Sequence, residues 1–215
     1  MLYRNKVDWI LKYIKNKKVL DLGCVEHSLT NMQNPNWLHG IIVKHAKSVL
    51  GVDILQKEID TLKHQGYNVV FAYVERMDLK DKFEVIVAGD IIEHASNPGT
   101  FMDRVFRHLT PDGMVLITTP NPVTVMRFIE LLLTGQVGAN SEHTCWFTPQ
   151  VISELARRNN LRVVNIAYVD DTYQYYRTRS KLWWPLLVAN FMICRLRPEA
   201  SETLCLVLTM ASTID

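Results

Sequence analysis

Short apolar runs alternate with stretches of helical periodicity along most of the chain. The apolar runs are typical of buried parallel strands, several of which end in glycine or aspartate, and the stretches between them repeat apolar residues at helical spacing. The expected strands cover 17–23, 47–53, 67–74, 82–90, 114–119, 161–169 and 202–210, and the expected helices include 5–16, 54–64 and 148–160. Strands separated by helices and joined by short connections predict an α/β fold, with a mainly parallel sheet and helices on both faces.

Two Asn-Pro pairs mark expected helix starts. Asn34-Pro35 and Asn97-Pro98 each offer a capping side chain followed by proline at the first helical position. After the first pair, one helical face would carry Trp37, Leu38, Ile41, Ile42 and His45.

Length and composition favour one domain and exclude some function classes. The 215 residues predict a single domain over 1–215, with inserts at about 122–147 and 170–200. A net charge of +2 gives no reason to expect a nucleic-acid partner. Four scattered cysteines are typical of reduced thiols, and neither a signal peptide nor an apolar run of 18 residues occurs, so a cytoplasmic location is expected.

Polar residues follow the expected strands at the edge where α/β sheets bind ligands. Asp21 and Gly23 end the first strand, Asp53 ends the second, and Asp90 ends the fourth. A carboxylate after the second strand suits a ribose, because it can accept hydrogen bonds from both hydroxyls. The alternative is a solvated aspartate that starts the next helix.

The loop after Gly23 argues against a dinucleotide. A pyrophosphate lies against backbone and requires the spacing GxGxxG, whereas this chain continues as GCVEHS with one glycine of three. S-adenosylmethionine carries an adenosine but no phosphate, so its demand for glycine is weaker. The loop therefore favours this cofactor over NAD.

Four ordered segments resemble class I S-adenosylmethionine-dependent methyltransferases, and the small-molecule subgroup in particular. They are VLDLGC (19–24), LGVDI (50–54), FEVIVAGDIIEH (83–94) and FRHLTPDGMVLITTPNP (106–122), and the segment 143–164 is similar to the element that usually follows. The resemblance implies a Rossmann-like sheet of seven strands in the order 3-2-1-4-5-7-6, with the last strand antiparallel. It also implies S-adenosyl-L-methionine as cofactor and a small-molecule methyl acceptor.

The same resemblance implies a set of cofactor contacts. Asp21, Gly23 and Cys24 would contact the methionine end of the cofactor, and Asp53 would bind the ribose. The adenine would lie against Ile54, Val74 and Glu75. Ala88, Gly89 and Asp90 would lie on the sulfonium side. The chain departs from the family pattern at Val25, Glu26 and His27, which replace small residues that contact the amino-acid part, and His27 would orient its carboxylate. Tyr73 stands where an aspartate commonly accepts from the adenine amine, and either stacks or packs.

Catalytic candidates are few, because methyl transfer depends mainly on positioning and needs a base only when the acceptor loses a proton. Asp90, His94 and His143 are the candidates, and each histidine has a purely structural alternative as a cap or carbonyl donor. No metal is expected, because Asp90 and Glu93 lack an evident third ligand.

Each insert carries an apolar helix. The first insert, with its helix at 123–133, is either a lid over the acceptor or a packing helix. In the second, tryptophans and basic residues flank the apolar stretch 182–196, which is typical of an interfacial helix. A dimer contact and a second lid are the alternatives, and an apolar surface on all sides favours burial against protein.

The sequence thus predicts methyl transfer from S-adenosylmethionine to an oxygen or nitrogen of a small molecule, with a sugar or a polysaccharide or lipid-linked precursor as first candidate. A non-catalytic S-adenosylmethionine-binding module is the first alternative. An NAD or nucleotide-sugar oxidoreductase is the second, which the missing glycines oppose.

Overall fold

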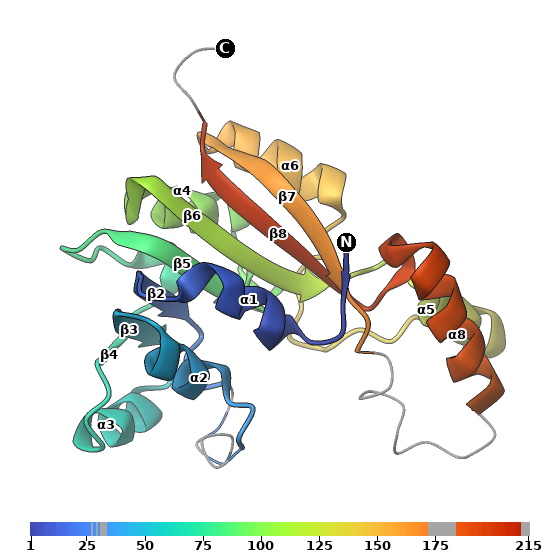
Figure 1. Cartoon of the computed structure of the whole chain (residues 1–215), viewed down its shortest axis with the longest axis horizontal. Coiled ribbons are helices and arrows are strands. Elements are labelled where there is room, and N and C mark those ends of the chain that lie inside the picture. The colour runs from blue at the N-terminus through green and yellow to red at the C-terminus, as the bar shows by residue number, and fades with distance from the viewer. Residues whose placement is uncertain (27, 29, 31–33, 172–183, 212–215) are drawn as a thin grey trace.

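The computed structural model describes residues 1–26, 28, 30, 34–171 and 184–211 of the chain. Its centre is an eight-stranded sheet in the order β1-β7-β8-β6-β5-β2-β3-β4, in which only β8 runs antiparallel to its neighbours (Figure 1). The strands are β1 (Leu2–Tyr3), β2 (Lys18–Leu22), β3 (Ser48–Asp53), β4 (Val69–Phe71), β5 (Phe83–Gly89), β6 (Leu109–Pro120), β7 (Leu161–Val169) and β8 (Thr203–Met210).

Seven of these strands stand in the predicted order, and the eighth corrects the expected count. β1 has only two residues and pairs in parallel with the end of β7, where Tyr3 lies opposite Val169. So short a strand has no periodicity of its own, so its sequence gives no signal of it. The pairing brings the N-terminal segment to the carboxyl edge of the sheet, next to the ligand-binding edge predicted above.

Helices cover both faces of the sheet, as predicted. They are α1 (Lys6–Ile14), α2 (Leu38–His45), α3 (Gln56–His64), α4 (Pro98–Arg107), α5 (Val125–Thr134), α6 (Pro149–Arg158) and α8 (Trp184–Leu196). Side chains alternate along each strand, so Val19 packs with α1 and α2 on one face while Leu20 packs with α4 and α6 on the other. Both layers exclude water, which makes the sheet a rigid support for its edge.

One of the two predicted helix starts is correct. The side chain of Asn97 accepts a hydrogen bond from the backbone of Thr100, and Pro98 begins α4. The start at Asn34-Pro35 was wrong, because the side chain of Asn34 closes a turn on the N–H of Asn36 and α2 begins at Leu38. The N–H of Leu38 is instead capped by the Glu26 carboxylate at 2.9 Å, a partner from the preceding loop.

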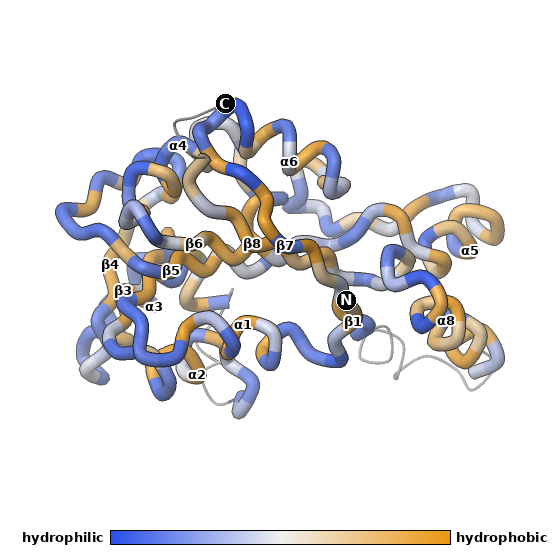
Figure 2. Tube along the Cα trace, turned by 45° about the horizontal axis from the view of Figure 1, so that its top comes forward, coloured by the Kyte–Doolittle hydropathy of each residue, from blue (hydrophilic) through white to orange (hydrophobic). Residues whose placement is uncertain are grey.

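Helices α5 and α8 extend beyond the carboxyl edge of the sheet and form a lobe there (Figure 1). Most of α8 is solvent-exposed, so its own chain does not provide the burial against protein that the sequence favoured, and a dimer contact stays a prediction. Figure 2 shows both helices as largely apolar. Residues 172–183, including the start of the apolar stretch 182–196, lie outside the described residues. In the described part of the chain, none of the helices has the length and apolar character needed to cross a membrane.

Candidate active site

Two adjoining cavities lie at the carboxyl ends of β2, β3 and β5. The larger has a volume of about 590 Å³ and the smaller about 140 Å³. Both are lined by the same five residues where they meet: Gly23, Asp53, Ile54, Ile91 and His94. The larger volume falls within the range of small-molecule sites, and the position is the one at which open α/β sheets bind ligands.

Gly23 forms the floor of this junction. Its φ of +81° is a conformation that side-chain-bearing residues rarely adopt, and its N–H donates to the carbonyl of Val52 at 2.8 Å. A Cβ added at Gly23 would lie 3.2 Å from Cδ1 of Ile91, within the space between the two cavities. The glycine therefore keeps the backbone open to close approach by a ligand.

Asp53 ties the loops after β2 and β3 together. One carboxylate oxygen accepts from the N–H groups of Ile54 at 2.8 Å and Leu55 at 3.1 Å. The other accepts from the N–H of Val25 at 3.0 Å, and Asp53 lines both cavities. The residue is thus buried and pre-oriented, as a ribose-binding carboxylate must be.

The side chains of Cys24 and Val25 point away from both cavities. They pack with Trp37, Ile59 and Leu62 in a small core beneath the loop, and the indole Nε1 of Trp37 donates to the carbonyl of Cys24 at 3.0 Å. A β-branched residue at position 25 is tolerated because it faces this core, while its backbone N–H faces Asp53. Burial raises the pKa of the Cys24 thiol, so it stays protonated.

A buried hydrogen-bonded pair supports the loop from below. Nδ1 of His39 lies 2.7 Å from a carboxylate oxygen of Asp21, and both side chains are almost fully buried. Burial raises the pKa of Asp21, and the hydrogen bond from His39 opposes this effect. The sequence prediction missed His39, because the expected face of the helix placed His45 inside, whereas His45 is exposed.

Lys6 is a second residue that the sequence prediction missed. Its ammonium lies 2.5 Å from a carboxylate oxygen of Asp90, and both residues line the larger cavity together with Glu26. Burial opposes ionisation of Asp90, but the Lys6 charge and the Thr118 hydroxyl outweigh it and lower the pKa of Asp90. Asp90 also has a φ of +51°, a strained conformation typical of functional positions.

Three candidate proton-binding groups, Glu93, His94 and His143, lie close together, and His94 lines both cavities. The rings of His94 and His143 are 4.7 Å apart, edge to face, although 49 residues separate them in the chain. Burial, followed by the neighbouring His94 and Arg127, lowers the pKa of His143, so its imidazole is neutral at neutral pH. Burial raises the pKa of Glu93 to about 8, and one of its oxygens accepts from the Thr119 hydroxyl at 3.0 Å.

The same three side chains could hold a metal ion. One donor atom each from Glu93, His94 and His143 lies within 4.8 Å of the others. The expectation of no metal relied on a missing third ligand, and His143 supplies a third donor from the loop after α5. That expectation stays a prediction, but the reason given for it does not hold.

The remaining predicted site residues divide between cavity wall and core. Val74, Glu75 and Tyr73 line the smaller cavity, where backbone N–H groups of Ser96 and Asn97 hold the Glu75 carboxylate at 3.3 and 2.6 Å. Gly89 lines the larger cavity, whereas Ala88 is buried in the core. His27 lies outside the described residues.

Residues 3–166 match the methyltransferase domain family. The matched span includes both cavities and every loop that lines them. The chain belongs to this family. The match confirms the resemblance that the four sequence segments carry, together with S-adenosylmethionine as the expected cofactor.

Individual relatives of this methyltransferase are distant. The mitochondrial ubiquinone biosynthesis O-methyltransferase of Bos taurus is 24% identical over 171 residues, which are 72% of this chain and 44% of that protein. The chain spans less than half the length of the first curated relatives that it matches.

Solved structures of similar fold cover nearly the whole chain. A methyltransferase from Mesorhizobium loti has a TM-score of 0.59 at 16% identity, and covers 94% of this chain and 95% of its own. The magnesium protoporphyrin IX methyltransferase of Synechocystis, solved with bound S-adenosylhomocysteine, has a TM-score of 0.62 at 11% identity, and covers 96% and 82%. At these identities the likeness shows the fold alone.

Proposed function

We propose that this methyltransferase transfers the methyl group of S-adenosylmethionine to an oxygen of a small molecule. The observation that carries the proposal is the pair of cavities that meet at Gly23 and Asp53, both lined by His94, whose ring contacts that of His143. The curated relatives are ubiquinone biosynthesis O-methyltransferases, which supports oxygen as the acceptor atom. A sugar or a lipid-linked precursor stays a prediction for the acceptor.

The residues present fit the cofactor. The smaller cavity, walled by Val74, Tyr73 and Phe101, suits the flat adenine, and Asp53 at the junction suits the ribose hydroxyls. The larger cavity presents the ammonium of Lys6 and the carboxylates of Asp90 and Glu26 to the charged amino-acid end. When bound, the cofactor supplies an electrophilic methyl group on a positive sulfonium.

The histidine pair suits removal of a proton from an acceptor hydroxyl. Neutral His143 can accept a proton at neutral pH, because burial and neighbouring cations lower its pKa. His94 lines both cavities and lies beside it, so a hydroxyl held at the rim would meet this pair. A hydroxyl is a poor nucleophile until it loses its proton, which gives the pair a role that an amine acceptor would not need.

A methyl-transfer assay tests the proposal. Purified protein would be incubated with radiolabelled S-adenosylmethionine and separate panels of hydroxylated aromatics, sugars and amines, and the label in each acceptor measured. We expect transfer to a hydroxyl compound and loss of transfer in His143→Asn. Binding of S-adenosylhomocysteine without transfer to any acceptor would favour the non-catalytic module, and binding of NAD in its place would favour the oxidoreductase.

A further inference from the structure

The lobe formed by α5 and α8 exposes a large apolar surface. Most of the large apolar side chains that are exposed among the described residues lie on it or at its entrance: Val123, Phe128, Leu131, Leu132, Leu133, Trp184, Val188, Phe191, Met192, Ile193 and Leu196. Both views show the two helices together at the same end of the molecule (Figures 1 and 2). An apolar patch of this kind marks a surface that contacts something less polar than water.

The burial pattern of α8 is the opposite of that of a helix on the surface of a globular protein. Its fully buried residues are Asn190 and Cys194, whereas Phe191, Met192 and Leu196 are exposed. A surface helix normally buries its apolar stripe and exposes its polar residues. The reversed arrangement means that the outward face of α8 gains free energy only when an apolar phase covers it.

Hydrogen bonds hold the two helices to the body at one point. The side-chain amide of Asn121, which precedes α5, donates to the carbonyls of Glu199 and Ser201, which follow α8, at 2.8 Å each. Arg127 of α5 donates in turn to the carbonyl of Asn121 at 3.1 Å. These contacts fix the base of the lobe, so its apolar surface has a set direction relative to the sheet.

Basic residues flank the apolar stretch of α8, and Asp170, Asp171, Glu199 and Glu202 lie just outside them. Residues 172–198 contain five Lys or Arg and no Asp or Glu, although the net charge of the whole chain is only +2. Among the described residues of this stretch, Arg195 and Arg197 are exposed at the end of α8. Apolar residues next to exposed cations complement an anionic lipid surface, which offers acyl chains and negative headgroups together.

We propose that the α5–α8 lobe docks on an anionic membrane surface, with its apolar side chains inserted and Arg195 and Arg197 at the headgroups. A second copy of the chain would cover the apolar residues but would bring two sets of arginines together, so the charge favours lipid as the occupant. The proposal does not depend on the proposed function.

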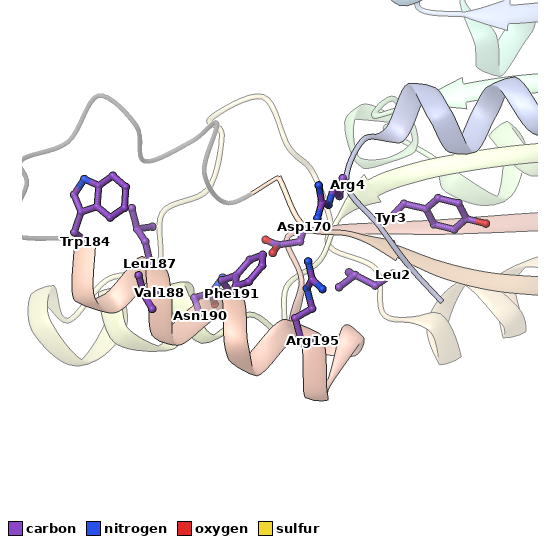
Figure 3. A pocket seen from close by; sticks show the side chains of 10 residues that line it. All are labelled: Leu2, Tyr3, Arg4, Asp170, Trp184, Leu187, Val188, Asn190, Phe191 and Arg195. Atoms are coloured by element: carbon purple, nitrogen blue, oxygen red, sulfur yellow. The ribbon is translucent and has the colours of Figure 1, made fainter.

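The lobe lies on the same side of the molecule as the candidate active site. A cavity of about 720 Å³ opens at its base between α8 and the N-terminal strand (Figure 3). Leu187, Phe191 and Arg195 line it on the side of the lobe, and Arg4 and Asp170 on the side of the body. Docking would therefore hold the carboxyl edge of the sheet near the lipid surface. The larger cavity, which Lys6 lines, lies at the same edge.

Vesicle co-sedimentation of the full chain tests the proposal. The probes are vesicles of phosphatidylcholine alone and vesicles in which part of it is replaced by phosphatidylglycerol, each at low and high salt. We expect binding to the anionic vesicles that weakens at high salt. The double variant Phe191→Ser, Met192→Ser should bind at least about tenfold more weakly. The pair Arg195→Glu, Arg197→Glu should lose about fivefold or more per charge, on anionic vesicles only.

Matched controls separate docking from general effects of substitution. Val151→Ser with Val164→Ser removes exposed apolar side chains from the body, and Lys44→Glu with Lys57→Glu reverses exposed charges there. Both control pairs should bind vesicles as the wild type does. The proposal is overturned by absence of binding to anionic vesicles, by equal binding of the Phe191 and Met192 variant, or by a stable dimer in light scattering that Phe191→Asp dissociates, which would make a second copy the occupant.

Discussion

The body of the sheet and the α5–α8 lobe differ in the burial of their apolar side chains. In the body, apolar residues from both helical layers are buried against the strands, and polar residues reach the carboxyl edge as buried, hydrogen-bonded groups such as Asp53 and the Asp21–His39 pair. In the lobe, many large apolar residues are exposed, whereas the polar Asn190 of α8 is buried. The body is therefore stabilised by its own packing and can orient a ligand, whereas the lobe is organised for contact with an external phase.

The largest expected difference between the two regions is in stability. Trp9 is 0% exposed between α1 and the sheet, whereas Trp184 of α8 is 57% exposed. Trp9→Ala should lower the free energy of unfolding by about 3–5 kcal/mol, because it leaves a cavity. Trp184→Ala should change it by less than about 1 kcal/mol. Urea titration of both variants measures this, and equal losses would mean that the lobe packs on the body in solution.

A buried carboxyl in the body should make stability depend on pH. The pKa of Glu93 is about 8 in the folded chain against an ordinary value of 4.5, so the native state holds this proton more tightly than the unfolded state. The stabilisation is complete below about pH 4.5 and is lost as pH rises through about 8. It amounts to a few kcal/mol, since each pKa unit is worth about 1.4 kcal/mol.

The variant Glu93→Gln measures this effect. Glutamine keeps the shape of the side chain and cannot ionise, so the stability gap between wild type and variant should move in favour of the variant between about pH 5 and pH 9. Glu154→Gln is the control, because the pKa of exposed Glu154 is lowered to about 2 and stays outside this range. A gap that does not change with pH would mean that Glu93 ionises freely in the folded chain.

A smaller effect is expected on the rate of methyl transfer. His143→Asn should lower kcat by about 100-fold, because it removes the proposed base, with little effect on cofactor binding. In the wild type the rate should fall on the acid side only at a pH lower than the ordinary histidine pKa of 6.5, because the pKa of His143 is lowered and its imidazole gains a proton only there. The variant should lack this limb of the pH profile. His45→Asn, at an exposed histidine, serves as control. An unchanged pH profile of the rate in His143→Asn would assign the proton transfer to another group.

The smallest effect concerns one hydrogen bond in the body. Asp53→Asn keeps the size of the side chain but removes the charged acceptor proposed for the ribose. We expect the Kd of S-adenosylhomocysteine to rise about tenfold, the typical cost of a charge-assisted hydrogen bond. Asp103→Asn, which removes a carboxylate on exposed α4, should leave Kd unchanged. Equal affinities in calorimetry would place the ribose away from Asp53.

Local signals in the sequence predicted much of the body. The bounds expected for β7 agree with those observed, because this strand follows a complete helical pattern and ends where Asp170 and Asp171 begin a polar stretch. The cap at Asn97 was also correct, since it depends only on adjacent residues. The order of the strands came from the family resemblance, as periodicity carries no information on which strands pair.

The parts that were missed depend on partners far apart in the chain. The start of α2 is set by Glu26, and its buried face by Asp21, which draws His39 inside in place of His45. Lys6 reaches Asp90 from a segment 84 residues earlier, and the same holds for His94 and His143, which come from separate loops. The composition of α8 indicated an apolar environment but not whether protein or an external phase supplies it.

The central claim is that an adenosine with an attached amino acid lies across the tips of β2 and β3, over Gly23. Calorimetric titration with S-adenosylhomocysteine tests it on the wild type, Gly23→Val and Gly66→Val. Both glycines have positive φ, at +81° and +87°, so both variants carry similar backbone strain, but a Cβ at Gly66 meets nothing within 4 Å. We predict that Gly66→Val binds as the wild type does while Gly23→Val shows no measurable binding. Wild-type affinity in a folded Gly23→Val would contradict the account.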